Sequence, residues 1–280
     1  RPPLEELKSH VKNIMAMRGV QCQEQQIILT AGAQQGISLI TRLLLEKNST
    51  VALEKLAYPG LLQALKPFTP NIVTITTNMK TGIDLHEVET TFKKMRPACL
   101  YLVADGGNPH GVTLNDEQRK ELANLAKEHE VPIIEDDPYG FLNYHQPRAP
   151  IKKYAEDWVF YIGSFSKLLA PTLRVGWIVA PQCMVRHLSS LKESSDINTA
   201  TFNHHLVNAL LNKNLFERHI QTLQNYYAKQ RNCLVNALTQ YFSYDIEFSI
   251  PECGFFIWVY FLEKINTSRL LQESLKQKVI

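Results

Sequence analysis

Apolar, β-rich runs alternate with helical patterns along the first 180 residues of this chain. Between the runs lie helical patterns at Gln35–Leu45, Leu85–Met95 and Asp116–His129, the last with Asn115 or Asp116 as its cap. Most runs are apolar throughout, as in strands buried on both faces of a sheet. The alternation predicts an α/β fold, with a mostly parallel, doubly wound sheet flanked by helices. The seven runs occupy residues 26–30, 50–54, 71–77, 98–104, 131–137, 158–165 and 174–180.

The pattern changes after residue 181. Helical spacing continues over residues 201–211 and about 215–241, and two short strand candidates follow at 246–250 and 254–261. A final amphipathic stretch begins at Thr267. We therefore expect a large domain over residues 1–243 and the start of a small α+β domain over 244–280, which the chain leaves incomplete. A length of 280 residues allows both.

Composition indicates a cytoplasmic protein. The 30 Lys and Arg against 27 Asp and Glu give a net charge of +3 without a basic run, so the chain shows no nucleic-acid element. The five cysteines have no zinc spacing and are expected to be buried in a reducing compartment. The longest apolar run, residues 253–262, is too short to span a membrane. The chain starts without Met or a signal peptide, which predicts a processed or partial chain.

A lysine stands in a hydroxyl-rich turn after the sixth apolar run. Lys167 lies seven residues before Arg174 in GSFSKLLAPTLRVGW, and Ser164 and Ser166 precede it. An amine with an ordinary pKa of about 10.4 becomes a nucleophile when a nearby cation or Schiff-base formation removes its proton. Hydroxyls and a guanidinium suit a phosphate. Together these groups indicate pyridoxal 5'-phosphate (PLP), a phosphorylated aldehyde that binds lysine.

Two other interpretations of this turn stay open. Most Ser/Lys turns are solvated loops. Ser164 and Lys167 also fit the S-x-x-K pattern of β-lactamases, and residues 80–82 spell K-T-G. The order of these motifs along the chain argues against the second interpretation, because K-T-G follows the nucleophile in those enzymes.

Polar residues follow three further strands, at the ends where ligands collect in a parallel sheet. Residues 31–36 are small enough to bring a helix start close to a phosphate, or form an ordinary tight turn. Asn108 offers an amide donor suited to a phenolate oxygen. Asp136 lies between Glu135 and Asp137, where a buried carboxylate needs a partner such as a protonated pyridine nitrogen. The alternatives are a metal site or a solvated turn, but no histidine has ligand spacing.

Five motifs occur together in one order: TAGAQQG, AYPG, GNPHG, EDDPYGF and GSFSKLLAPTLRVGW. In this respect the chain resembles the fold type I PLP-dependent aminotransferases over nearly all of its length. The resemblance is strongest to the branch of kynurenine/2-aminoadipate aminotransferases and the aminotransferase-like domains of MocR-type regulators.

The resemblance implies a role for each matched residue. Lys167 would form the internal aldimine and carry the proton between the substrate Cα and the cofactor C4'. Asp136 would pair with the pyridinium nitrogen. Tyr139 and Asn108 would bind the ring oxygen, and Tyr58 would stack on the ring. The residues implied to bind phosphate are Ala33, Gln34, Ser164, Ser166 and Arg174.

The sequence departs from the family pattern in several places. His110 replaces the usual Thr of N-P-T-G, and Gly107 replaces an aromatic residue or Gln. Family members continue for roughly a hundred residues beyond Ile280 and carry there an arginine for the substrate carboxylate, so we expect a chain truncated at both ends.

The resemblance leaves three functions open. The first is a homodimeric aminotransferase that moves an amino group between an L-amino acid and a 2-oxo acid. The second is an effector-sensing domain of a MocR-type regulator. The third is other PLP chemistry, such as β-elimination or decarboxylation.

Overall fold

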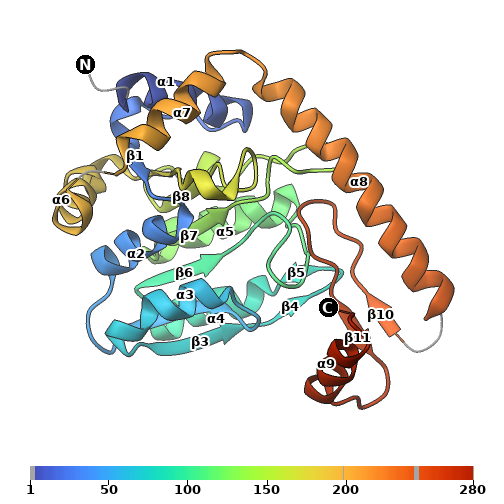
Figure 1. The fold of residues 1–280 in the computed structure, drawn as a ribbon. Helices are drawn as coiled ribbons and strands as arrows, with labels where there is room; N and C mark the ends of the chain where they lie inside the picture. Colours follow the sequence, from blue (N-terminus) through green and yellow to red (C-terminus); the bar gives the residue numbers. More distant parts are fainter. Residues whose placement is uncertain (1–3, 198, 243–245, 280) are drawn as a thin grey trace.

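Seven strands form a single twisted sheet in the computed structural model, which describes residues 4–197, 199–242 and 246–279. They coincide with the seven predicted runs and lie in the order β1-β9-β8-β7-β6-β2-β3 (Figure 1). Strands β8, β7, β6, β2 and β3 pair in parallel, whereas β9 runs antiparallel to both β8 and β1. The predicted mostly parallel sheet is therefore confirmed. The strands are β1 (Ile27–Thr30), β2 (Thr50–Glu54), β3 (Asn71–Ile75), β6 (Cys99–Leu102), β7 (Ile133–Asp137), β8 (Val159–Ser164) and β9 (Gly176–Val179).

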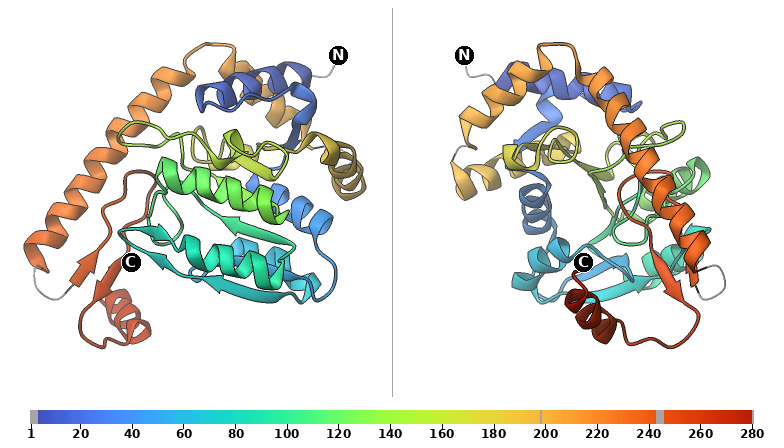
Figure 2. Two further views of the ribbon diagram at one scale, coloured as in Figure 1. Left: turned by 180° about the vertical axis from the view of Figure 1, so that it is seen from behind. Right: turned by 45° about the vertical axis from the view of Figure 1, so that its right-hand side comes forward.

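Helices cover both faces of this sheet (Figure 2). Adjacent residues of a strand point to opposite faces, so Ile134 packs into one apolar cluster and Ile133 into another. One face carries α2 (Ala33–Leu44), α3 (Pro59–Leu65) and α6 (Val185–Asp196). On the other face, α4 (Leu85–Met95) and α5 (Asp116–His129) pack against β2, β6 and β7. On the same face, α1 (Leu4–Met17) and α7 (Thr201–Leu211) pack against β1, β8 and β9. A hairpin of β4 (Thr77–Asn78) and β5 (Gly82–Ile83) precedes α4.

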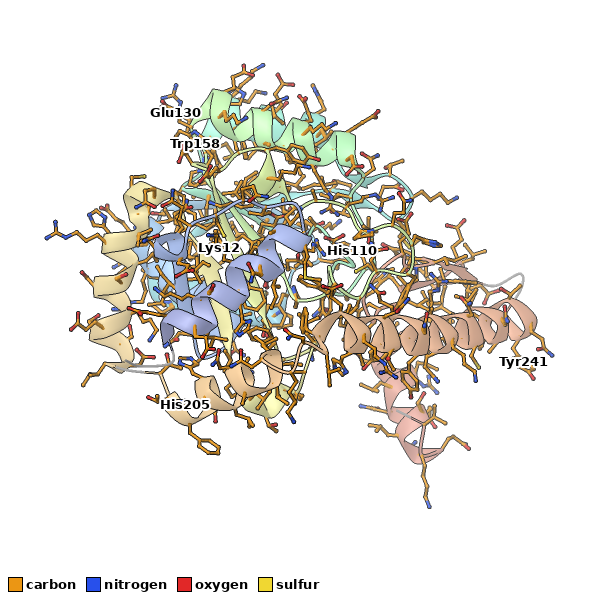
Figure 3. The ribbon with its side chains drawn as sticks, turned by 90° about the horizontal axis from the view of Figure 1, so that it is seen from above. Lys12, His110, Glu130, Trp158, His205 and Tyr241 are labelled. Atoms are coloured by element: carbon orange, nitrogen blue, oxygen red, sulfur yellow. The ribbon has the colours of Figure 1, made fainter. Side chains whose placement is uncertain are left out.

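A long helix, α8 (Phe216–Tyr241), runs along one side of the molecule toward β10 (Ile246–Phe248), β11 (Val259–Phe261) and α9 (Thr267–Lys276). Figure 3 shows Tyr241 at its outer end, far from the sheet. The strand expected over residues 254–261 is present only as β11. The boundary predicted between residues 243 and 244 lies outside the described residues, and the two-domain division stays a prediction.

Residues 251–256, which we call the return segment, leave this outer region and pack against the sheet domain. The backbone N–H of Tyr144 donates to Glu252 O at 2.8 Å, and that of Gly254 donates to Leu142 O at 3.2 Å. The backbone of the return segment thus bonds to the 142–144 turn and does not extend β11, whereas Trp258 O accepts from the N–H of Ser249 at 2.9 Å.

Two further findings concern residue types. Cys22, Cys99 and Cys253 are buried, but Cys183 and Cys233 are exposed, so the expectation that all five cysteines are buried is wrong for these two. Cys183 lies in a short 3-10 turn before α6, and Cys233 lies on α8, of which one side faces solvent. Within the described ranges, no helix is long and apolar enough to cross a membrane.

The cap of α5 gives a first test of the fold. Asn115 Oδ1 accepts from the N–H of Gln118, and the Gln118 side chain accepts from the N–H of Asn115, which makes a capping box. We predict that Asn115→Ala lowers the free energy of unfolding by about 1 kcal/mol, measured by urea denaturation. Asn115→Asp is the matched control and should change it by only a few tenths, because aspartate caps equally well. Equal losses in both variants would contradict the cap.

Candidate active site

One cleft of about 290 Å³ opens at the edge of the sheet where six strands end and β9 begins. All ten residues that the family resemblance singled out line it. They come from six different strand ends or turns and are far apart in the sequence. The lining also includes Val103, Pro138, Pro171 and Phe256; the ten are Ala33, Gln34, Tyr58, Asn108, Asp136, Tyr139, Ser164, Ser166, Lys167 and Arg174.

Lys167 is presented to the cleft by a turn that is anchored on both sides. Phe165 and Leu168 are buried, and the Phe165 ring packs on the buried Trp177 ring with centroids 4.9 Å apart. The Ser164 hydroxyl at the end of β8 accepts from the N–H of Ser166 at 3.1 Å. Lys167 itself stays exposed. The amine therefore stands on a rigid support at the mouth of the cleft.

An anion site lies beside this turn. The guanidinium of Arg174 donates to Ala31 O at 3.1 Å and reaches the Ser166 hydroxyl at 3.4 Å. Gly32, with φ +88°, precedes α2, and a Cβ there would lie 2.5 Å from Arg174 Nη2, so this position requires glycine. Ala33 belongs to the first turn of α2, whose N–H groups have no intrahelical acceptor and attract anions. Backbone donors, hydroxyls and a cation thus converge on one point.

The opposite wall of the cleft is formed by the turn that follows β2. The amide of Gln34 donates to Gly60 O at 2.8 Å, which joins this turn to the start of α2. Tyr58 lies in the same turn and packs against the apolar cluster below. The contact holds an aromatic ring beside the anion site.

The three carboxylates at the end of β7 have three different environments. Glu135 accepts from the N–H groups of Ile151 and Lys152 at 2.8 and 2.9 Å, yet burial raises its pKa to about 7. Asp137 accepts from the Tyr161 hydroxyl at 2.8 Å and forms an ion pair with Arg18 at 3.1 Å. Both side chains point away from the cleft, because β7 alternates its faces.

Asp136 points into the cleft and is only half satisfied. Its Oδ2 accepts from the Tyr101 hydroxyl at 2.7 Å, but its buried Oδ1 has no hydrogen-bond partner among the described residues. Burial raises the pKa of Asp136 to about 7, and the negative charge of Asp137 acts in the same direction. An open, buried carboxylate oxygen in a cleft fits a cationic N–H such as a protonated ring nitrogen. The site residues therefore fit PLP.

Asn108 and Tyr139 both line the cleft. Burial raises the pKa of Tyr139, so its hydroxyl remains a neutral donor. The ring of Phe256 packs edge-on against Tyr139 with centroids 5.7 Å apart. Within the described ranges, no three His, Cys, Asp or Glu residues are grouped so that they could hold a metal ion, and the metal alternative gains no support there.

The two departures from the N-P-T-G pattern have one cause. A Cβ at Gly107 would lie 2.1 Å from the His110 ring, so the imidazole occupies the space of a side chain at position 107. His110 is buried, accepts from the N–H of Val112 at 3.1 Å and lies 3.1 Å from a carboxylate oxygen of Glu54. His110 is labelled in Figure 3. The combination of Gly107 and His110 thus changes the packing inside the turn, while Asn108 still lines the cleft.

Sequence reasoning missed two residues of the site. Tyr101 holds Asp136, and alternation along the predicted strand was the available signal, because Tyr101 faces the same cluster as Ile134. Phe256 comes from the return segment, and no local pattern indicated that this segment reaches the cleft.

Comparison with known proteins agrees with this architecture. The sequence pattern of "Aminotransferase class I and II" matches residues 2–280, and the chain belongs to this family. It is close to kynurenine and aminoadipate aminotransferases. The Pyrococcus horikoshii kynurenine aminotransferase, solved in complex with PMP, is 31% identical, with a TM-score of 0.91 over 98% of this chain and 69% of that one. LysN, an α-aminoadipate aminotransferase from Thermus thermophilus, is 28% identical, with a TM-score of 0.92 over 98% and 70%.

Regulators also appear among the relatives. The HTH-type transcriptional regulator YisV of Bacillus subtilis is 28% identical over 98% of this chain and 57% of its own length. This chain spans between 57% and 71% of the length of four curated relatives that it matches.

The raised pKa of Asp136 predicts the direction in which stability changes with pH. Because the pKa is about 7 in the fold and about 4 in an unfolded chain, the folded protein binds the extra proton between these values, and stability falls as the pH rises through that window. Asp136→Asn removes the free-energy cost of ionising this buried carboxyl group, which is at most about 4 kcal/mol above pH 7. We predict that the cofactor-free variant is more stable than wild type at pH 8, with a difference that shrinks toward pH 5, in urea denaturation.

The exposed Asp157 provides the matched control for this measurement. Asp157→Asn should show no such pH trend. A lower stability of Asp136→Asn at pH 8 would contradict the proposed environment of Asp136.

Proposed function

We propose that this chain forms the cofactor-binding part of a PLP-dependent aminotransferase that moves an amino group between an L-amino acid and a 2-oxo acid. The observation that carries the proposal is the open oxygen of Asp136 in the same cleft as the amine of Lys167 and the guanidinium of Arg174. Lysine for the aldehyde, carboxylate for the ring nitrogen and a cation for the phosphate are the complementary groups that PLP requires.

When bound, PLP supplies an electron sink for the charge left when a substrate Cα–H bond breaks. The chain's own residues do the remaining work. Arg174, with Ser164 and Ser166, binds the phosphate by charge-assisted hydrogen bonds. Asp136, fixed by the Tyr101 hydroxyl, keeps the proton on the ring nitrogen. Further residues with a stated role are Asn108 and Tyr139, which donate to the ring oxygen, Tyr58, which stacks on the ring, and Ala33 and Gln34, whose N–H groups face the phosphate.

Lys167 has two roles in this proposal. Its amine would hold the cofactor by condensing with the aldehyde, with water as the leaving group, and the free amine would accept the substrate proton and return it. Buried neighbours anchor the backbone of its turn, so the fold fixes the point from which the side chain enters the cleft. A homodimer is part of the proposal.

The covalent role of Lys167 is directly testable. We predict that full-length protein incubated with PLP absorbs in the near-visible range, and that borohydride reduction fixes the cofactor on Lys167 in peptide mass spectrometry. Lys167→Ala should lose both signals, whereas Lys152→Ala, at a buried lysine outside the cleft, should keep the cofactor if it folds. Wild type that stays colourless would overturn the proposal.

The phosphate role of Arg174 predicts a graded loss of affinity. Arg174→Met should weaken PLP binding at least about tenfold, because a charge-assisted hydrogen bond is lost. Arg42→Met, at an exposed arginine of α2 outside the cleft, should bind PLP as wild type does. The measurement is an absorbance titration of the cofactor-free protein. Equal affinities of the Arg174 and Arg42 variants would contradict the phosphate site.

The similarity to YisV supports a second candidate, an effector-sensing domain of a MocR-type regulator. Both functions use the same cofactor contacts, so binding experiments do not separate them. An amino-donor screen with full-length protein does: formation of 2-oxo acid supports the enzyme. PLP binding without turnover, together with a winged helix-turn-helix encoded before Arg1, supports the regulator.

A further inference from the structure

Two buried aspartates beside the cleft have no part in the proposed chemistry. Asp105 lies three residues before Asn108, and Asp137 lies two residues before Tyr139. Their side chains are 2% and 3% exposed. They therefore lie where the two turns that carry the proposed donors to the ring oxygen begin. We call these two positions, Asp105 and Asp137, the roots of the turns.

One guanidinium connects these two roots. Arg18 follows α1, and its Nη2 lies 2.8 Å from Asp105 Oδ2 and 3.1 Å from Asp137 Oδ2. Its side chain is 2% exposed, and the Phe141 ring centroid lies 5.3 Å from its Cζ. Neither Nε nor Nη1 of Arg18 has a hydrogen-bond partner in the part of the chain that the structure describes. The ion pairs of Arg18 are thus both made to the roots of the site turns.

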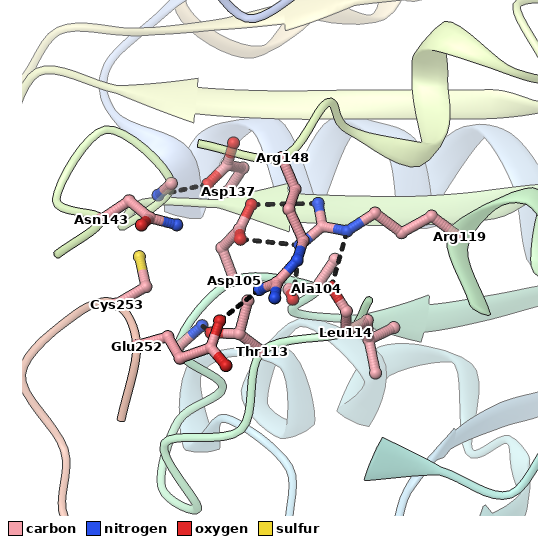
Figure 4. Close-up of polar contacts among 12 residues, drawn as sticks. Ala104, Asp105, Thr113, Leu114, Arg119, Asp137, Asn143, Arg148, Glu252 and Cys253 are labelled. Carbon is pink, nitrogen blue, oxygen red and sulfur yellow. Dashed lines mark hydrogen bonds and ion pairs between the residues drawn. The ribbon is translucent and has the colours of Figure 1, made fainter. Parts of the chain in front are cut away.

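A second arginine holds only one of the roots. Arg119 of α5 contacts Asp105 through two nitrogens, Nη2 to Oδ1 at 2.7 Å and Nη1 to Oδ2 at 3.1 Å, as Figure 4 shows. Its remaining bonds go to the carbonyls of Ala104, Leu114 and Ala149. Arg119 is as deeply buried as Arg18 and shares Asp105 with it, but its ion pair within the described residues is with Asp105 and not with Asp137.

Charge keeps this chain of contacts intact. Although burial opposes ionisation, Arg119 and Arg18 lower the pKa of Asp105 to about 2. Burial also opposes the charge of Arg18, but Asp137 and Asp105 raise its pKa. The sequence of contacts Arg119, Asp105, Arg18, Asp137 alternates in sign along its length. Removing one partner of a buried ion pair lowers the free energy of unfolding more than replacing both partners together does.

We propose that Arg18 is a positioning residue that locks the turn carrying Asn108 to the turn carrying Tyr139. The proposal rests on the proposed function for the ligand that these turns hold, but the coupling between the turns does not depend on any ligand. Asn108 and Tyr139 can donate to one ring oxygen only while their turns keep a fixed separation. Arg18, outside the cleft, sets that separation through the two carboxylates.

The experiment compares Arg18→Met with Arg119→Met in the full-length protein. In the cofactor-free state, Arg18→Met should speed hydrogen exchange in residues 105–112 and in residues 138–143. Arg119→Met should do so only in the first stretch, because it holds Asp105 alone. In absorbance titrations, Arg18→Met should weaken PLP binding at least about tenfold beyond Arg119→Met, since misaligned hydrogen bonds to the ligand are lost. Melting temperatures are measured for both variants.

A double variant separates positioning from charge balance. Arg18→Met with Asp137→Asn removes one charge of each sign, so it should regain stability without regaining PLP affinity. If Arg18→Met does not fold, Arg18→Lys and Arg119→Lys replace the two single variants in the exchange and affinity comparisons, because lysine keeps the charge but has a shorter reach.

Three results would overturn the proposal: exchange in residues 138–143 that is unchanged without Arg18, an affinity loss matched by Arg119→Met, or recovery of affinity in the double variant. Failure of wild type to bind PLP would instead overturn the proposed function, and the hydrogen-exchange comparison would still decide whether Arg18 couples the turns.

Discussion

The cost of burying negative charge governs the edge of the sheet where the cleft lies. Asp105, Asp136 and Asp137 are each at most 5% exposed, and a buried carboxylate is stable only with hydrogen bonds or a cation beside it. Arg18 serves Asp105 and Asp137, so the scaffold neutralises these two internally. Among the described residues, Asp136 is hydrogen-bonded by the Tyr101 hydroxyl alone and keeps one oxygen open. Of these three aspartates, the one with an open carboxylate oxygen is therefore the one that lines the cleft.

Sheet topology explains why these groups meet. The parallel strands β8, β7, β6 and β2 end at one edge, and the antiparallel β9 begins there. Lys167 after β8 and Arg174 before β9 thus reach the same cleft from strands of opposite direction. A ligand at this edge contacts the ends of many strands, whose positions are fixed by the core below them. Preorganisation of this kind lowers the entropy cost of binding.

The sequence predicted the elements whose signal is local and missed those that depend on tertiary contacts. All seven sheet strands were expected because strands buried on both faces are apolar throughout, and α5 has the predicted bounds. Helix α1 was missed although Leu7, Val11 and Ile14 have helical spacing and are buried. Residue patterns indicated Lys167, Ser164, Ser166, Arg174, Asn108, Asp136 and the 31–36 turn. The resemblance gave all ten site residues their roles, and the structure brings them together. Tyr101 and Arg18 were not found, because their roles depend on which residues neighbour them across the sheet.

The return segment shows how a distant part of the chain completes the cleft. Cys253 donates its thiol to Tyr139 O at 2.9 Å, and Arg148 and Glu252 form an ion pair at 2.5 Å, the second drawn in Figure 4. These contacts place Phe256 at the wall of the cleft and in edge-on contact with the Tyr139 ring. The turn that carries Tyr139 is therefore in contact with residues of the return segment. Arg18 contacts Asp137 at the start of the same turn, so two restraints from distant parts of the chain act on the same few residues.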